Sequence, residues 1–180
     1  MADISSTDAY AIGNEATAAY GLVEQWDGTA WTRPAAQPPF PMPNGGTFAQ
    51  NTVSAISATS ASNVWIVGTY LQTVYGNIWD PYSVHWDGTA WTITPSPAAG
   101  TLTGITARSA SDVWAVGYTT GPQTLTLHWD GTTWTTVPSP NAGSASQLTS
   151  VSASPSAAIV WAAGYSGVSG SFNPLTLRNG

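Results

Sequence analysis

The sequence predicts an all-β fold of β-propeller blades, each with four antiparallel strands, that form an incomplete ring within one chain. Short runs of β-branched and aromatic residues alternate with polar residues, and no stretch carries the apolar stripe of a helix. The 18 glycines and 13 prolines fall largely between these runs. The pattern repeats with a period in the forties to fifties of residues, and each repeat holds four strand-like segments, which is the content of a propeller blade.

Two phrases mark each repeat. The phrase Trp-Asp-Gly-Thr-x-Trp begins at Trp26, Trp86 and Trp129. The second phrase is an apolar run that ends in glycine. Its first three copies begin at Asp8, Asn63 and Asp112, each upstream of a Trp-Asp-Gly-Thr-x-Trp copy, and a fourth begins at Ile159. A β-sandwich of seven to nine strands is the alternative architecture, but a sandwich does not predict a four-strand period.

The cleanest copy shows how the four strands follow one another. Its strand-like segments are 102–107, 113–118, 124–129 and 132–137. The second of these is apolar on both faces, as expected for a strand that is buried on two sides. A short polar turn, a loop with Gly121 and Pro122, and an Asp-Gly turn connect the segments.

The repeats divide one partial propeller domain, 1–180, into about three and a half blades. We expect blades at 1–50 with a truncated inner strand, at 51–99 with an expanded loop from Thr69 to Tyr82, at 100–141, and at 142–180 with the outer strand missing. Repeat units cannot bury both faces alone, and an open end exposes strand edges. The sequence therefore predicts either a piece of a longer array or a homo-oligomer that completes the ring.

The Trp-Asp-Gly-Thr phrase predicts a tight hairpin. With Asp87-Gly88 as a two-residue type I′ turn, Trp86 and Trp91 would share a face and lie diagonally across the two strands. We therefore interpret the repeated tryptophans as structural residues that pack between blades. They are Trp26, Trp31, Trp65, Trp86, Trp91, Trp114, Trp129, Trp134 and Trp161.

These phrases give the chain a resemblance to a known group. It resembles bacterial β-propeller repeat proteins with the pattern S-A-S-D-V-W-A-V-G-Y followed by H-W-D-G-T-x-W-T-x-V-P-S-P, and residues 109–118 carry the first half of this pattern. The blade plan is broadly similar to WD-repeat and kelch propellers, although the kelch double glycine is absent. The resemblance covers nearly the whole chain and implies the propeller fold.

Composition excludes several partners. The net charge is −6, with three arginines and no lysine, so the chain is not expected to bind nucleic acid. It has no transmembrane run and no polybasic segment, so we expect no membrane insertion. There is no cysteine, and no metal or cofactor motif, so no cofactor is expected. Only 7% of residues are charged, which is common in extracellular or cell-surface repeat proteins, but no signal peptide is visible and the compartment stays open.

The connections on one rim of the blades vary between copies, and variable loops on a rigid scaffold are where binding is usually found. Aromatic rings together with an amide and a carboxylate suit sugar recognition, although the same rings could merely pack the expanded loop onto its blade. The candidate ligand-binding residues are Tyr70, Tyr75, Asn77, Trp79, Asp80 and Tyr82.

No residue is predicted to be catalytic, and the chain is not expected to be an enzyme. His85 and His128 share one repeat position, where the first copy has Gln25, so we interpret both as structural. The sequence favours a non-catalytic scaffold that binds a protein or glycan on the variable rim. The alternative is a propeller lectin. Such lectins bind sugars between blades through Arg, Glu and Trp; Glu24 beside Gln25-Trp26 is similar to this pattern, but the matching arginine is missing.

Overall fold

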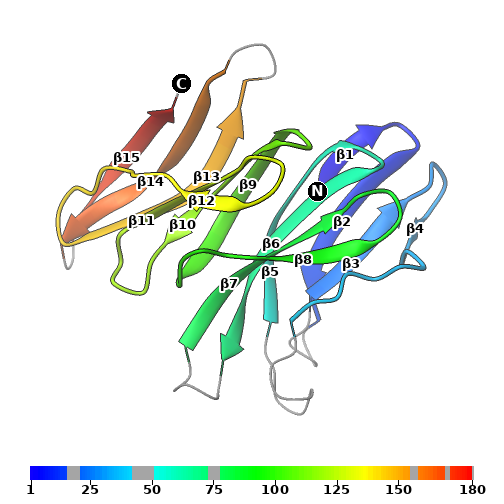
Figure 1. Cartoon of the computed structure of the whole chain (residues 1–180), viewed down its shortest axis with the longest axis horizontal. Helices are drawn as coiled ribbons and strands as arrows, with labels where there is room; N and C mark the ends of the chain where they lie inside the picture. Colours follow the sequence, from blue (N-terminus) through cyan, green and yellow to red (C-terminus); the bar gives the residue numbers. More distant parts are fainter. Residues whose placement is uncertain (16–20, 42–50, 73–77, 155–157, 169–170, 180) are drawn as a thin grey trace.

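A computed structural model describes residues 1–15, 21–41, 51–72, 78–154, 158–168 and 171–179. The described chain forms four antiparallel sheets that lie side by side in sequence order (Figure 1). The all-β prediction is thus confirmed. Among the described residues there is no helix long and apolar enough to cross a membrane.

Each sheet is a meander of strands that follow one another along the chain. The first sheet contains β1 (Ala2–Ser5), β2 (Asp8–Asn14), β3 (Gly21–Trp26) and β4 (Trp31–Thr32). The second contains β5 (Asn51–Ser60), β6 (Asn63–Gln72), β7 (Ile78–Trp86) and β8 (Trp91–Pro95). The third contains β9 (Thr101–Ser109), β10 (Asp112–Tyr118), β11 (Thr124–Trp129) and β12 (Trp134–Thr136). The fourth contains β13 (Ala145–Ala153), β14 (Val160–Val168) and β15 (Ser171–Asn179).

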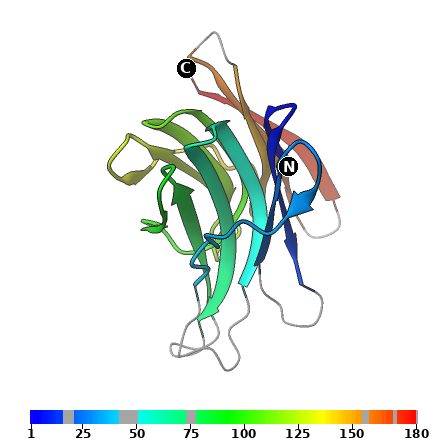
Figure 2. The ribbon, with the colours of Figure 1, turned by 90° about the vertical axis from the view of Figure 1, so that its right-hand side faces the viewer.

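The core lies between the sheets. Strand β6 shows why, because successive side chains point to opposite faces of a strand. Val64 and Ile66 pack in a cluster with the first sheet, whereas Trp65 and Val67 pack in a cluster with the third. All four are fully buried. The turned view shows the sheets stacked face to face at an angle (Figure 2).

The Trp-Asp-Gly-Thr turn differs from the prediction. Trp86 pairs directly with Trp91, so the loop has four residues and the two rings are opposite rather than diagonal, with centroids 5.5 Å apart. The predicted two-residue turn is wrong because the Asp87 carboxylate itself closes a wider turn. Its Oδ1 accepts hydrogen bonds from the amides of Thr89 and Ala90, at 2.8 and 2.9 Å. Gly88 supplies the positive φ, 95°.

The predicted loop from Thr69 to Tyr82 is largely strand in its described part. Strand β6 continues to Gln72 and β7 begins at Ile78. In the fourth sheet, likewise, β14 continues to Val168 and β15 begins at Ser171. The reason is that cross-strand pairing continues beyond the buried part of each hairpin, with Gln72 paired to Ile78 and Val168 paired to Ser171.

In each of the first three sheets, two turns lie on the same rim, as the strand order predicts. In the second sheet the Trp86 indole N–H donates to the carbonyl of Ala61, in the turn between β5 and β6, at 3.0 Å. Trp26 and Trp129 make the same contact in the first and third sheets, at 3.1 Å each. We call this the turn rim and the opposite one the loop rim.

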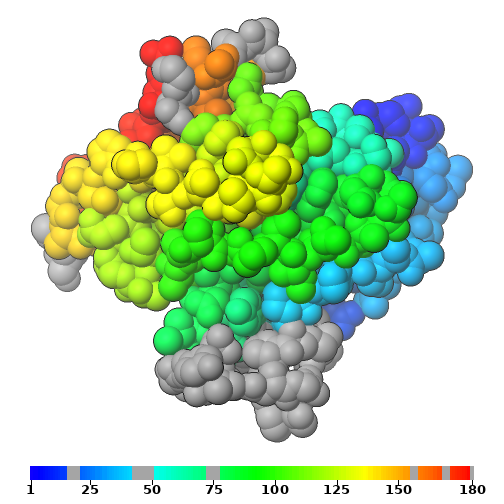
Figure 3. Space-filling model, viewed as in Figure 1, coloured from blue at the N-terminus to red at the C-terminus, as the bar shows by residue number. Residues whose placement is uncertain are grey.

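The repeated tryptophans differ in exposure. Trp65, Trp114 and Trp134 are buried between sheets. Trp31 and Trp161 are 41% and 49% exposed, because each lies on the outward face of an end sheet. The space-filling view shows the outer strand of the third sheet, in yellow, lying against the green outer segment of the second (Figure 3).

Candidate functional site

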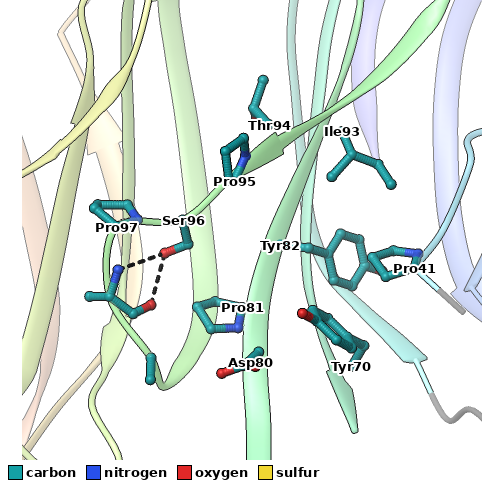
Figure 4. A pocket seen from close by; sticks show the side chains of 12 residues that line it. Pro41, Tyr70, Asp80, Pro81, Tyr82, Ile93, Thr94, Pro95, Ser96 and Pro97 are labelled. Carbon is teal, nitrogen blue, oxygen red and sulfur yellow. Dashed lines mark hydrogen bonds between the residues drawn. The ribbon is translucent and has the colours of Figure 1, made fainter. Parts of the chain in front are cut away.

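A cleft of about 450 Å³ opens at the loop rim of the second sheet. We call it the tyrosine cleft (Figure 4). Tyr70, Asp80 and Tyr82 come from the long β6–β7 hairpin, Pro41 comes from the connection that follows the first sheet, and residues 93–99 form the outer wall. Its volume lies in the ~300–1,000 Å³ range of small-molecule sites.

Strand pairing brings the three hairpin side chains together. Tyr70 pairs directly with Asp80, and Tyr82 lies two residues further along β7, on the same face. The ring centroids of Tyr70 and Tyr82 are 6.4 Å apart. The ring of Phe40 packs edge-on against Tyr82 at 6.2 Å. The cleft therefore has an aromatic wall supported from behind.

Tyr82 is a fixed part of this wall. Its hydroxyl donates to the carbonyl of Thr52 at 3.2 Å, and the side chain is 2% exposed. Burial raises the pKa of Tyr82 well above its usual range, so the phenol stays protonated. Its ring fits because the residue paired with it is Gly68, where a Cβ would lie 2.6 Å from the Tyr82 hydroxyl.

Tyr70 and Asp80 supply the polar groups of the cleft. Burial and the neighbouring negative charge of Asp80 both raise the pKa of Tyr70, which keeps its hydroxyl a donor at neutral pH. The Asp80 carboxylate is an acceptor. No basic side chain is found among the residues described as lining the cleft. Its electrostatics therefore suit a neutral ligand rather than an anionic one.

Proline residues form much of the remaining surface. Pro81, Pro95 and Pro97 line the cleft with Pro41. Ser96 holds the outer segment in shape, because its hydroxyl donates to the carbonyl of Ala98 at 2.9 Å. The rings present flat apolar surface with fixed backbone angles. Sequence patterns did not single out this wall, although the sequence contains a Pro-Ser-Pro segment at the end of β8.

The structure separates Trp79 from the other predicted site residues. Trp79 is adjacent to Asp80 in β7 and therefore lies on the opposite face of the strand. It lines a second cleft, of about 370 Å³, between the second and third sheets, together with Tyr118 and Pro122. Its side chain is 39% exposed. Of the other candidates, Tyr75 and Asn77 lie outside the described residues. The described candidates thus divide into three in one cleft and one in the other.

The histidines are held in a repeated structural arrangement. His85 stacks on Trp65 with centroids 4.0 Å apart, and both side chains contact Asn63 Oδ1, at 2.8 and 3.0 Å. His128 and Trp114 contact Asp112 Oδ1 in the same way, at 3.1 and 2.9 Å. No group of three or more potential metal ligands occurs in the described part of the chain.

No protein-family model and no curated protein matches the sequence. Among solved structures, the chain is similar to a fucose-specific lectin from Aleuria aurantia, in a mercury-derivative form. The TM-score is 0.54 at 14% sequence identity, and the match covers 91% of this chain and 55% of the lectin chain. The chain thus spans about half the length of that lectin. Its fold is all-β and propeller-lectin-like.

Tyr82 is the sequence signal that could have singled out this cleft. At the position paired with the glycine of the second strand, the other three sheets have Leu22, Leu125 and Leu175. Only the second sheet places a tyrosine there. A departure from an otherwise apolar repeat position, next to an extended hairpin, distinguishes the site from the scaffold.

Proposed function

We propose that the chain is a carbohydrate-binding propeller module that holds a neutral sugar in the tyrosine cleft. The observation that carries this is the meeting of Tyr70, Asp80 and Tyr82 in one concave cleft of the second sheet. The likeness to a fucose-specific lectin supports it at the level of fold.

The chemistry of the cleft suits a sugar. A pyranose ring has apolar faces that stack on aromatic and proline rings, and hydroxyls that need donors and acceptors. Tyr70 offers a hydroxyl and a ring, Asp80 a carboxylate, and the prolines further apolar surface, while the buried ring of Tyr82 supports Tyr70 from behind. Tyr82 is not proposed to bind through its hydroxyl, because that group donates to Thr52.

Binding rather than catalysis is proposed. The described lining contains one carboxylate, Asp80, whereas most glycosidases need a pair flanking the scissile bond. A concave cleft of this size is also more suited to a small ligand than to a protein surface, which usually presents a broad and flatter contact. For these reasons we favour the lectin hypothesis over the protein-binding scaffold.

A glycan array followed by calorimetry with the best neutral sugar tests the proposal. Asp80→Asn and Tyr70→Ala should each weaken binding about tenfold or more, since each removes a polar contact in a partly dehydrated site. Trp79→Ala is the matched control, because it removes an aromatic residue from the same hairpin but from the other cleft. A blank array would overturn the proposed function. Loss of binding in the Trp79 variant alone would instead overturn the choice of cleft.

We also propose that copies of the chain associate head to tail. On β3, Val23 packs toward the second sheet, so Glu24 and Trp26 face outward, and Trp31 faces outward beside Trp26. At the other end, Trp161 faces outward beside Arg178, whose guanidinium lies 6.0 Å from the indole centroid. The two outward faces thus present tryptophans with opposite charges.

Charge reversal tests this association. Sedimentation should show concentration-dependent assembly of the unmodified chain, and Glu24→Arg or Arg178→Glu alone should weaken it, because like charges would then meet. The double variant should recover assembly. A mass of one chain at all concentrations would overturn the proposal, as would assembly that neither single variant changes.

A further inference from the structure

Trp134 shows what fills the junction between the second and third sheets. This residue begins β12, and its ring inserts against the second sheet, where it is 4% exposed. Its indole N–H donates to the hydroxyl of Ser83 at 2.9 Å and lies 3.2 Å from that of Thr94. The ring meets Trp65 edge-on, with centroids 5.6 Å apart. The indole thus satisfies a buried hydroxyl and fills an apolar space at once.

The third sheet contains the same receptor positions. Trp65 pairs with His85 in the second sheet, and Trp114 pairs with His128 in the third. Val67 pairs with Ser83, as Val116 pairs with Thr126. Thr94 lies opposite Ser83, as Val137 lies opposite Thr126. The counterparts of Trp65, Ser83 and Thr94 are therefore Trp114, Thr126 and Val137.

These three counterparts line a groove between the third and fourth sheets. Its opposite wall comes from the fourth sheet and includes Ala162 and Leu177. The Thr126 side chain is 9% exposed, and its Oγ1 is buried without a hydrogen-bond partner. A buried hydroxyl normally has a partner, because leaving one unpaired costs free energy. Ser139 and Arg178 are the other polar residues of the lining, and the rest of it is mainly apolar. One unsatisfied hydroxyl thus lies at the place where Ser83 receives an indole N–H.

The edge beside this groove is available for one more strand. In the described part of the chain, β15 is hydrogen-bonded to β14 alone, whereas the corresponding third strand of every other sheet is also bonded to an outer strand. Each of those outer strands begins with tryptophan followed by threonine; they are β4, β8 and β12. An edge strand of this kind is a template for pairing with another polypeptide.

We propose that this groove is a receptor for a tryptophan-bearing strand of another polypeptide. The strand adds to the edge of β15, and its indole enters between the third and fourth sheets and donates its N–H to Thr126 Oγ1. An indole meets both requirements of the groove, since it has a large apolar surface and one donor. The occupant has the composition of β12, a tryptophan followed by β-branched residues.

A peptide with the sequence of residues 129–140, W-D-G-T-T-W-T-T-V-P-S-P, is the probe. We expect saturable binding to the full chain by fluorescence anisotropy, and binding at least tenfold weaker for the peptide in which the second tryptophan is alanine. We also expect slower hydrogen exchange of β15 amides in the complex. Absence of binding, equal affinity of the two peptides, or unchanged β15 exchange would each overturn the proposal.

Two matched receptor variants identify the hydroxyl. Thr126→Val keeps the side-chain shape and removes the unsatisfied group, so it should raise the melting temperature of the free chain while weakening peptide binding severalfold. Ser83→Ala removes the equivalent hydroxyl where an indole is already bound, so it should lower the melting temperature and leave peptide affinity unchanged. If Thr126→Val neither stabilises the chain nor weakens the peptide, the proposed contact is wrong.

Discussion

On the face of the second sheet that meets the third, Trp134 is 4% exposed and its indole N–H donates to a buried hydroxyl. On the face that meets the first sheet, Tyr70, Asp80 and Tyr82 border a cleft of about 450 Å³. Both faces belong to the same strands, because successive side chains along a strand point to opposite faces. The difference shows that the two faces of one sheet can serve different purposes. An indole fills part of the space on one face, whereas a few side chains near the loop rim border a cleft on the other.

The largest effect should come from removing the Trp134 indole from the junction between the second and third sheets. Trp134→Ala should lower the free energy of unfolding by about 3–5 kcal/mol, because it leaves a cavity beside Trp65 and removes a buried hydrogen bond. Urea denaturation measures this. Trp91→Ala changes the same repeat position on the other face, where the ring is only partly buried, and should cost clearly less. Equal losses would show that the two junctions are packed alike.

The next largest effect should come from Gly68→Ala, beside the tyrosine cleft. A Cβ there would lie 2.0 Å from the carbonyl oxygen of Thr52 and 2.6 Å from the Tyr82 hydroxyl, so the strand and the ring must move. We expect a loss of about 1–3 kcal/mol and weaker sugar binding. Gly13→Ala is the control at the same repeat position, where a Cβ would meet nothing within 4 Å. A Gly68 variant as stable as the Gly13 variant would contradict the tight fit of Tyr82.

Restoring the repeat at Tyr82 should separate stability from binding. Tyr82→Leu places there the residue found at the matching position of the other three sheets. The lost hydrogen bond to Thr52 should cost about 1 kcal/mol, whereas sugar affinity should fall about tenfold, because Tyr70 loses the ring that packs beside it. Parallel denaturation and calorimetry measure the two. Unchanged affinity would show that Tyr82 does not position Tyr70 for binding.

The sequence predicted the fold well because its signals are local and repeated. Strand alternation, the Trp-Asp-Gly-Thr phrase and the turns all follow from neighbouring residues. The predicted length of the Trp-Asp-Gly-Thr turn was wrong, because the sequence does not show that Asp87 Oδ1 accepts hydrogen bonds from two backbone amides. The extent of the β6–β7 hairpin was also missed, because its end carries polar and aromatic residues that suit strand and loop equally.

The candidate site was only partly predictable. Tyr70, Asp80 and Tyr82 could be selected by composition, but the assignment of Trp79 to the other face depends on strand register, which an apparent loop does not provide. Pro41 joins the cleft from another sheet, and such a contact depends on how the sheets stack. Sequence patterns therefore located the hairpin, while the tertiary packing decided which of its side chains share a cleft.

The smallest effect should be a pH dependence of the unfolding free energy that arises from His85, which stacks on Trp65. Burial against Trp65 lowers the pKa of His85, and the charge of Asp87 only partly opposes this. The unfolded chain then binds more protons than the folded chain near and below the ordinary histidine pKa of about 6.5. Stability should therefore fall as pH decreases from 7.5 to 5.5, a range in which ordinary carboxylates stay ionised. His85→Gln, which introduces the residue of the first sheet, should flatten the difference in unfolding free energy across this range. A variant with the same pH slope as the original chain would show that His85 is not responsible.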